Sequence, residues 1–305
     1  MYSIYCDYIA DVACVSGEDV AVKRIIDVDN LSSDDQKSLR AIFLKELRIT
    51  ASMDHPNIVK LIGCCPRPLS AVFECLSVNM AEIFDIEHDN GSSANVNNLG
   101  QLLAWLNQND AFLCFEKETE FPESVAADVG TGLTYIHSRN IAHRDLKPQN
   151  VLVTFSDGRV TAKLADFGEA RSLVIQTRSI IHMQTSVLAR GTFVFNAPEI
   201  VLGQLSGAGL QDLMKADVWS YGMILFCLMN PGLKYPWEVE VRSNPADYQA
   251  IVRDKMRAGT LPSHEETREY HPLLPVMLKS CMYNRNERPD MTDIITMLHM
   301  CAIFS

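Results

Sequence analysis

The most constraining feature of this 305-residue sequence is the segment His143-Arg144-Asp145-Leu146-Lys147-Pro148-Gln149-Asn150, which Asp166-Phe167-Gly168 follows sixteen residues beyond Asn150. The triplets Val151-Leu152-Val153 and Ala162-Lys163-Leu164 lie between the two motifs and flank the turn signal 156–158, so they predict a short hairpin. The five fixed letters of the first motif have a chance frequency of about one in three million per position. The pair of motifs is therefore a highly specific signal.

The first 80 residues predict strands around one helix. Residues 19–26 are β-branched and mostly apolar, which is typical of a strand buried on both faces, and Lys23 ends their apolar run. Ser33-Asp34-Asp35-Gln36 has the form of a capping box, and apolar residues follow it at helical spacing. This spacing places Glu46 on the inward face of the helix. Because an unpaired buried carboxylate is strongly destabilising, the sequence predicts a cationic partner for Glu46.

The rest of the chain predicts two more strands and then mainly helices. The strands are expected at 57–62 and 71–73, and the more polar residues 74–79 have the character of a connector. The polar segment 88–98, rich in Asn and Ser, predicts a mobile surface loop. From about residue 80 the pattern becomes helical, with helices expected at 123–138, 212–229 and 291–303.

Two further motifs flank the first pair: Val20-Ala21-Val22-Lys23 upstream and Ala197-Pro198-Glu199 downstream. With four motifs in this order, the sequence resembles the eukaryotic protein kinases over nearly the whole chain. Leu61-Ile62-Gly63-Cys64 and the segment 217–222 further resemble the tyrosine-kinase-like group of Ser/Thr kinases.

The resemblance implies one domain, residues 1–305, with a bilobal α+β fold. A small, mainly β N-lobe with one key helix would span 1–73, a hinge 74–80 and a larger helical C-lobe 81–305. Asp217 would hold the backbone of the catalytic loop. Glu199 and Arg288 would form a buried ion pair that serves stability rather than chemistry.

The resemblance also implies phosphoryl transfer, for which a protein must align two oxygens and neutralise charge. Asp145 would accept or orient the proton of a substrate hydroxyl. Asp166 and Asn150 would hold Mg²⁺ or Mn²⁺ bridging the phosphates of ATP. Lys23 would contact the α and β phosphates. Glu46 would be the ion-pair partner of Lys23, which explains its place on the inward face of the helix.

The acceptor implied by the resemblance is a Ser or Thr hydroxyl on a protein substrate. Lys147, two residues after Asp145, marks Ser/Thr kinases and would add positive charge near the γ-phosphate. Gly191-Thr192 before the downstream motif also has the Ser/Thr form of the peptide-binding segment. The apolar Phe193-Val194-Phe195-Asn196 departs from the usual Pro and Tyr-Met content, which leaves the peptide preference open.

An adenine site is implied around the connector. Phe73 has the position of the gatekeeper, and the backbone from Glu74 to Leu76 would bind adenine. Ala21 and Leu152 would sandwich the ring. For Ala21, Phe73 and Leu152 a plain buried-core role is nearly as well supported by the sequence.

One element of the family pattern is missing. A Gly-rich loop should precede the lysine strand, with glycines near positions 3, 5 or 6, and 8, but the first glycine is Gly17 in the turn before that strand. Glycine lets backbone amides approach phosphate closely. Two alternatives follow: a kinase whose N-lobe is truncated at its first strand, or a pseudokinase that binds partners with little phosphotransfer.

The segment 166–199 is the expected site of regulation. A phosphate, added by an activating kinase or by autophosphorylation, would pair with Arg144 and order this segment. The candidate acceptors are Ser172, Thr177, Ser179, Thr185 and Ser186.

Composition limits the partners and the cellular location that the protein can have. The formal charge is −11, from 27 basic and 38 acidic residues, which argues against a nucleic-acid-binding or membrane-coating protein. The apolar run 223–229 is too short to span a bilayer and predicts a buried helix. Nine scattered cysteines without metal-finger spacing favour reduced thiols and a cytoplasmic location. His137 and the other lone histidines show no ligand spacing and are predicted to be surface or satisfied core residues.

Overall fold

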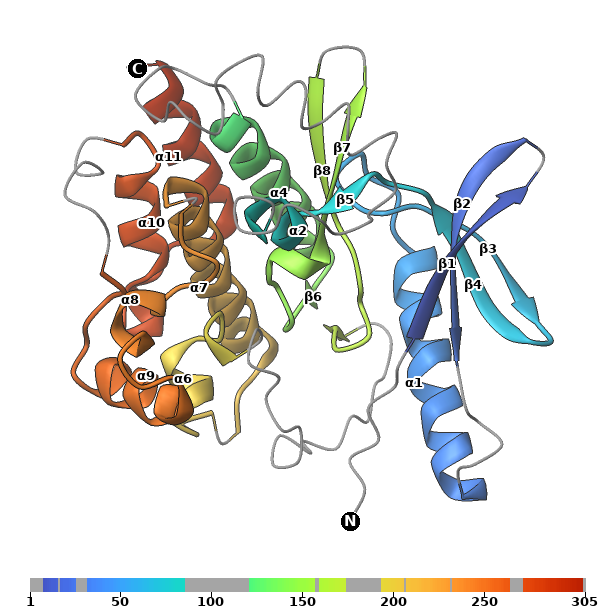
Figure 1. The fold of residues 1–305 in the computed structure, drawn as a ribbon, viewed down its shortest axis with the longest axis horizontal. Coiled ribbons are helices and arrows are strands. Elements are labelled where there is room, and N and C mark those ends of the chain that lie inside the picture. The colour runs from blue at the N-terminus through green and yellow to red at the C-terminus, as the bar shows by residue number, and fades with distance from the viewer. Residues whose placement is uncertain are drawn as a thin grey trace.

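The computed structural model describes residues 8–15, 17–25, 32–85, 121–156, 159–173, 193–205, 207–230, 232–263 and 271–303. Strands and one long helix form a small lobe at the right of Figure 1, and helices form a larger lobe at the left. The predicted bilobal α+β fold is confirmed. The division at residues 73 and 80 remains a prediction, with β4 ending at Glu74 and α2 beginning at Met80.

The small lobe contains a four-stranded antiparallel sheet in the order β1-β2-β4-β3. Its strands are β1 (Tyr8–Val15), β2 (Glu18–Ile25), β3 (Leu61–Pro66) and β4 (Leu69–Glu74). Gly17 turns β1 into β2 with φ of 89°, a left-handed conformation that glycine adopts without strain. The expected glycine positions 3, 5 and 6 lie outside the described residues, and Tyr8 is the first residue of β1.

Helix α1 (Ser33–Ala51) packs on this sheet through a small core of Phe43, Leu47 and Ala71. The predicted cap is wrong by one residue. Ser32 is the N-cap, and its hydroxyl oxygen accepts from Asp35 N at 3.2 Å, whereas Ser33 is the first helical residue. A hydroxyl three residues before the amide is the geometry that capping requires, and Ser32 has it here.

The strand predicted at 57–62 is also wrong in its first four residues, because strand β3 begins only at Leu61. Residues 57–59 pair instead with the end of β8 (Arg159–Leu164) in the large lobe. Leu164 N donates to Asn57 O and Val59 N donates to Leu164 O, each at 2.9 Å, and Asn57 Nδ2 donates to Ala162 O at 3.0 Å. This segment therefore joins the two lobes.

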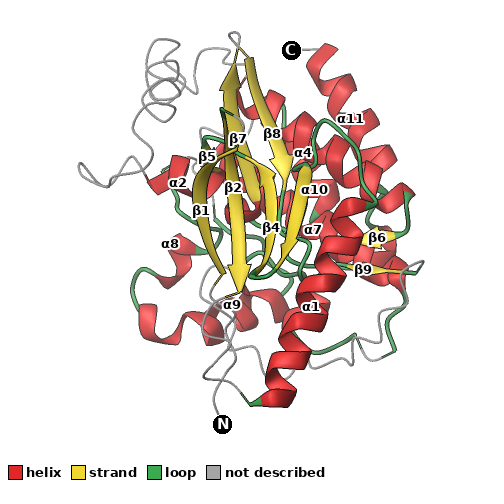
Figure 2. Ribbon diagram, turned by 90° about the vertical axis from the view of Figure 1, so that its right-hand side faces the viewer, coloured by secondary structure: helices red, strands yellow, loops and turns green. Residues whose placement is uncertain are grey.

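A second sheet, in the order β5-β7-β8, lies between the small lobe and the helices of the large lobe (Figure 1), and it is partly covered by the strands of the small lobe in the view of Figure 2. It combines β5 (Val78–Asn79) with the hairpin of β7 (Val151–Ser156) and β8, which confirms the predicted hairpin. A two-stranded sheet pairs β6 (Ile141–Ala142) with β9 (Arg171–Ser172). These strands bracket the segments that carry the catalytic-loop and Asp-Phe-Gly motifs.

The large lobe is organised around α7 (Leu210–Met229), whose side chains are almost all buried, as the apolar run 223–229 predicted. The predicted helices at 123–138 and 291–303 correspond to α4 and α11. The helices described in this lobe are α2 (Met80–Asp85), α4 (Phe121–Ser138), α6 (Pro198–Val201), α7, α8 (Glu238–Val241), α9 (Tyr248–Arg257), α10 (Leu274–Ser280) and α11 (Met291–Ile303). No helix in the described ranges is long and apolar enough to cross a membrane.

At Gly222, helix α7 packs tightly against the C-terminal end of α10. A Cβ there would lie 2.4 Å from Cys281 Sγ and 2.8 Å from Ser280 Cβ. We expect Gly222→Ala to lower the free energy of unfolding by about 1–2 kcal/mol, because overpacking outweighs the gain in helix propensity. Thermal unfolding measures this change. Gly63→Ala, where a Cβ meets nothing within 4 Å, is the control, and equal melting temperatures for the two variants would contradict the packing.

Candidate active site

Lys23 bridges the two lobes. It lies on β2, and its Nζ is 2.7 Å from Glu46 Oε1 on α1 and 3.1 Å from Asp166 Oδ1. Glu46 is buried, as its position on the helix predicted, and Lys23 is the cationic partner that the buried carboxylate requires. The structure therefore brings three of the predicted site residues together.

The electrostatics of this group follow from one cation between two carboxylates. Burial alone would lower the pKa of Lys23, but Asp166 and Glu46 outweigh it, so its pKa lies above the usual value. Burial opposes ionisation of Asp166 as well, yet Lys23 and the amide of Gly168 hold its pKa below the usual value. Burial raises the pKa of Glu46, whose Oε2 is buried without a hydrogen-bond partner in the described structure. The 2.7 Å contact with Lys23 nevertheless favours the charged pair.

Asp217 of α7 holds the backbone of the catalytic loop, as the resemblance implied. Its carboxylate accepts from His143 N and Arg144 N, both at 2.8 Å. Arg144 has φ of 70°, a strained conformation for a non-glycine residue, and this clamp compensates for it. His143 in turn packs against Phe167 with ring centroids 5.0 Å apart and contacts Ala165 O at 3.0 Å. The loop and the Asp-Phe-Gly motif are thus fixed to each other.

Asp145, Lys147 and Asn150 form one hydrogen-bonded group. Asp145 Oδ2 lies 2.8 Å from Lys147 Nζ and accepts from Asn150 Nδ2 at 3.0 Å. Asn150 Nδ2 also donates to Asp145 O at 2.7 Å. Because both donors engage Oδ2, Asp145 Oδ1 has no partner in the described part of the chain.

The donor set fits a magnesium ion. Asp166, with φ of 59°, has a side chain that is 44% exposed, so its carboxylate is accessible. Asn150 uses its amide nitrogen on Asp145, which leaves its oxygen for a cation. Across the described residues no cluster of three or more His, Cys, Asp or Glu gathers. Mg²⁺ needs none, since it is held by one or two carboxylates together with substrate phosphates.

The residues predicted to contact adenine lie on two different sheets. Ala21 and Phe73 are cross-strand neighbours on β2 and β4, and Leu152 lies on β7 opposite Asn79. All three, and Leu76, are half-buried rather than fully buried. The roles of Ala21, Leu76 and Leu152 at a nucleotide remain predictions.

Glu74 has a contact that sequence reasoning missed. Lys163 Nζ lies 2.8 and 2.7 Å from the two carboxylate oxygens of Glu74, and Lys60 N donates to Oε1 at 2.7 Å. The side chain of Glu74 therefore ties the connector to β8. The alternation of polar and apolar residues along β8, in which Lys163 is the last polar residue, is the one sequence signal that could have indicated this pair.

Two basic groups meet at the end of the Asp-Phe-Gly segment. Arg144 Nη1 donates to Glu169 O at 3.0 Å, and Lys45 Nζ of α1 lies 3.5 Å from Gly168 O. Burial lowers the pKa of Lys45, and Arg144 lowers it further, although Glu169 opposes both. Lys45 was not among the predicted site residues, since nothing in its spacing distinguishes it from a surface lysine.

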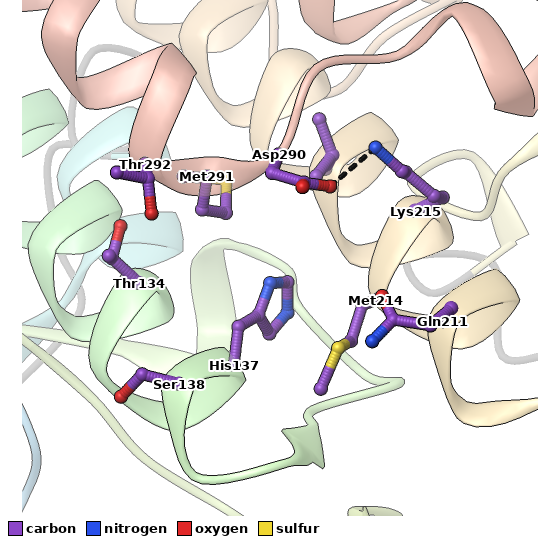
Figure 3. Close-up of a pocket in the computed structure, with 10 residues that line it drawn as sticks. Thr134, His137, Ser138, Gln211, Met214, Lys215, Asp290, Met291 and Thr292 are labelled. Atoms are coloured by element: carbon purple, nitrogen blue, oxygen red, sulfur yellow. Dashed lines mark hydrogen bonds and ion pairs between the residues drawn. The ribbon is translucent and has the colours of Figure 1, made fainter.

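A separate cavity of about 190 Å³ lies where the end of α4 meets the beginnings of α7 and α11 (Figure 3). His137 lies in it, and its Nε2 is 3.0 Å from Asp217 Oδ2, so this histidine is satisfied, as predicted. Typical sites for drug-sized ligands measure roughly 300–1,000 Å³. The cavity is too small for a nucleotide. Its lining residues are Thr134, His137, Ser138, Gln211, Met214, Lys215, Val218, Asp290, Met291 and Thr292.

The segment leading into α6 is buried, and an ion pair anchors its C-terminal end. Glu199 pairs with the fully buried Arg288 through two contacts of 2.7 Å, which confirms the predicted ion pair. The side chains of Phe193, Val194 and Phe195 are also buried, so they belong to the core.

Comparison with known proteins agrees with this arrangement. Residues 12–300 match the protein kinase domain family. Serine/threonine-protein kinase CTR1 of Arabidopsis thaliana is 30% identical over 287 residues, covering 92% of this chain and 28% of that protein. Serine/threonine-protein kinase STY46 of the same plant is 27% identical over 288 residues, covering 93% of this chain and 40% of that protein.

Mitogen-activated protein kinase kinase kinase 1 of Homo sapiens is 26% identical over 262 residues, covering 83% of this chain and 15% of that protein. The chain thus spans well under half the length of each of these relatives. The names of the two plant proteins describe them as serine/threonine-protein kinases, the class to which the sequence resemblance points. Through the matched domain and the arrangement of Lys23, Glu46 and Asp166, the chain belongs to the protein kinase domain family.

Proposed function

We propose that this chain is an ATP-dependent protein serine/threonine kinase, which transfers the γ-phosphoryl group of Mg-ATP to a Ser or Thr hydroxyl of a protein substrate. The observation that carries the proposal is the bridge of Lys23 Nζ between Glu46 and Asp166. This bridge places a cation, Lys23, beside the carboxylate that would bind the metal, Asp166. The phosphates of ATP require both a cationic side chain and a metal ion.

In the proposed reaction, the substrate oxygen bonds to the γ-phosphorus as the bond from that phosphorus to the bridging oxygen breaks, and ADP leaves. Asp145 Oδ1, which has no partner among the described residues, takes the hydroxyl proton. Lys147, held 2.8 Å from Asp145, and Lys23 offset the negative charge of the phosphates. Bound Mg²⁺ supplies further charge neutralisation, and Asp166 with Asn150 would hold it. Mn²⁺ suits the same oxygen donors.

The rest of the proposal concerns the protein substrate and regulation. Residues 191–199 would position the substrate, and a phosphate within 166–199 would pair with Arg144. Ser172 is buried in β9, and Thr177, Ser179, Thr185 and Ser186 lie outside the described residues. We propose a cytoplasmic location, which suits the seven described cysteines, all of which are free thiols.

A pseudokinase is the second candidate, because the expected positions of the Gly-rich loop hold Ser3, Tyr5 or Cys6, and Tyr8, the first residue of β1, rather than glycine. Phosphotransfer from Mg-ATP to casein and histones, followed by phosphoamino-acid analysis, separates the two. We expect phosphoserine and phosphothreonine, and no transfer once EDTA removes the metal. Nucleotide binding without any transfer would favour the pseudokinase, and phosphotyrosine as the main product would contradict the Ser/Thr assignment.

A further inference from the structure

The segment 193–197 is fixed by a contact that its sequence does not suggest. We propose that Arg253 of α9 is a positioning residue for the protein substrate, acting through the ring of Phe193. This inference rests on the proposed function, in which residues 191–199 position the substrate.

Two side chains of α9 contact one aromatic ring, that of Phe193. Phe193 is 0% exposed, and Arg253 Cζ lies 5.0 Å from the centroid of its ring. The ring of Tyr248, at the start of α9, meets Phe193 edge-on with centroids 5.9 Å apart and an interplanar angle of 81°. Both arrangements are attractive, because the ring face carries partial negative charge and the ring edge partial positive charge.

Arg253 has no carboxylate partner in the described part of the chain, so the Phe193 ring is the contact that its guanidinium makes there. Arg257, one turn further along the same helix, differs in this respect. Its Nη1 lies 2.8 Å from Asp254 Oδ1, and its side chain is 63% exposed. The two arginines therefore form a natural pair for comparison.

The backbone of the segment follows the placement of Phe193. Asn196 N donates to Phe193 O at 3.3 Å, and Ser220 Oγ of α7 donates to Phe195 O at 2.9 Å. Because the side chains of Phe193 and Phe195 are buried, the segment offers a substrate the position of its backbone rather than these rings. Glu199 fixes the C-terminal end through Arg288, and Arg253 fixes the N-terminal end. Loosening the N-terminal end should weaken substrate binding without touching the nucleotide.

The test compares Arg253→Met, Arg253→Lys and Arg257→Met in the full chain. Methionine keeps an unbranched stem over the ring but removes the cation, and lysine restores a cation. We expect Arg253→Met to raise the KM for casein about three- to tenfold, the change that follows from losing a half-buried cation–π contact. The KM for ATP should stay within about twofold, since Lys23 and Asp166 are unaltered. Arg253→Lys should recover most of the loss, and Arg257→Met should match the unaltered chain.

Amide hydrogen exchange of peptides covering 193–201 gives a readout that needs no turnover. Faster exchange in Arg253→Met, but not in Arg257→Met, is expected. The inference would be overturned if Arg253→Met left the KM for casein unchanged, or raised the KM for casein and the KM for ATP equally. Unchanged amide exchange in this variant would overturn it as well. If the unaltered chain transfers no phosphate, the proposed function fails and the substrate role fails with it. Exchange then still decides whether Arg253 fixes the segment.

Discussion

Replacing Asp145 by asparagine is expected to lower phosphotransfer by about 10²–10⁴-fold, the range usual for loss of a positioned general base. The substitution keeps the size and most hydrogen bonds of the side chain but removes the oxygen that takes the hydroxyl proton. It also removes the negative charge that lies 2.8 Å from Lys147 Nζ. Lys23, Glu46 and Asp166 keep their contacts with one another, so affinity for nucleotide should persist.

Rates of phosphotransfer to casein and the dissociation constant of an ATP analogue measure these two effects separately. Asp34→Asn, on the exposed start of α1, is the matched control and should behave as the unaltered chain. An Asp145→Asn variant that kept most of its rate would remove Asp145 from the reaction. Equal background signal from both chains would show that this chain is not an enzyme and would favour the pseudokinase.

Replacing Arg288 by methionine is expected to lower the free energy of unfolding by about 3–5 kcal/mol, because it leaves the buried carboxylate of Glu199 without a cation. Arg288 makes more than one kind of contact. Its Nη1 and Nη2 each lie 2.7 Å from a Glu199 oxygen, and its Nε donates to Met282 O at 2.7 Å. Its Cζ lies 5.2 Å from the ring centroid of Trp219. The variant therefore loses a hydrogen-bonded network as well as a charge.

Urea or thermal unfolding tests this expectation, and the melting temperature should fall by roughly 5–15 °C. Arg242→Met is the control, since Arg242 pairs with Glu238 at 3.3 Å from an exposed position, and exposed pairs contribute about 1 kcal/mol or less. The double variant Glu199→Gln with Arg288→Met should be more stable than Arg288→Met alone, because the orphaned charge is gone. If Arg288→Met melted like Arg242→Met, the buried pair would not stabilise the lobe.

Several parts of the site were predictable because each depends on local pattern. The helical spacing of α1 placed Glu46 inward and called for a cation, and Lys23 fills that role. The family resemblance anticipated the clamp by Asp217 and the pair of Glu199 with Arg288. The turn signal between residues 153 and 162 predicted the β7–β8 hairpin. These are cases in which sequence spacing or a fixed motif specifies the contact.

Other parts were not predictable, because they depend on segments far apart in the chain. Residues 57–59 are apolar enough for a strand of the small sheet, yet they pair with β8 of the large lobe. Glu74 was expected at adenine through its backbone, but its side chain is held by Lys163, 89 residues away. Nothing in the sequence near Phe193 indicates the guanidinium of Arg253 over its ring.

The sequence by itself determined the family and the two-lobed architecture and predicted the groups for phosphoryl transfer, because motifs and periodicity are local features of a chain. Only the tertiary structure decided which of these groups meet. Lys23 reaches Asp166 across 143 residues, and Asp217 reaches the loop across 74, since ionic contacts form where folded elements converge. The His143–Asn150 loop and the Asp166-Phe167-Gly168 motif marked the chemistry. The packing of α1, α7 and the β7–β8 hairpin around them sets the geometry in which we expect it to occur.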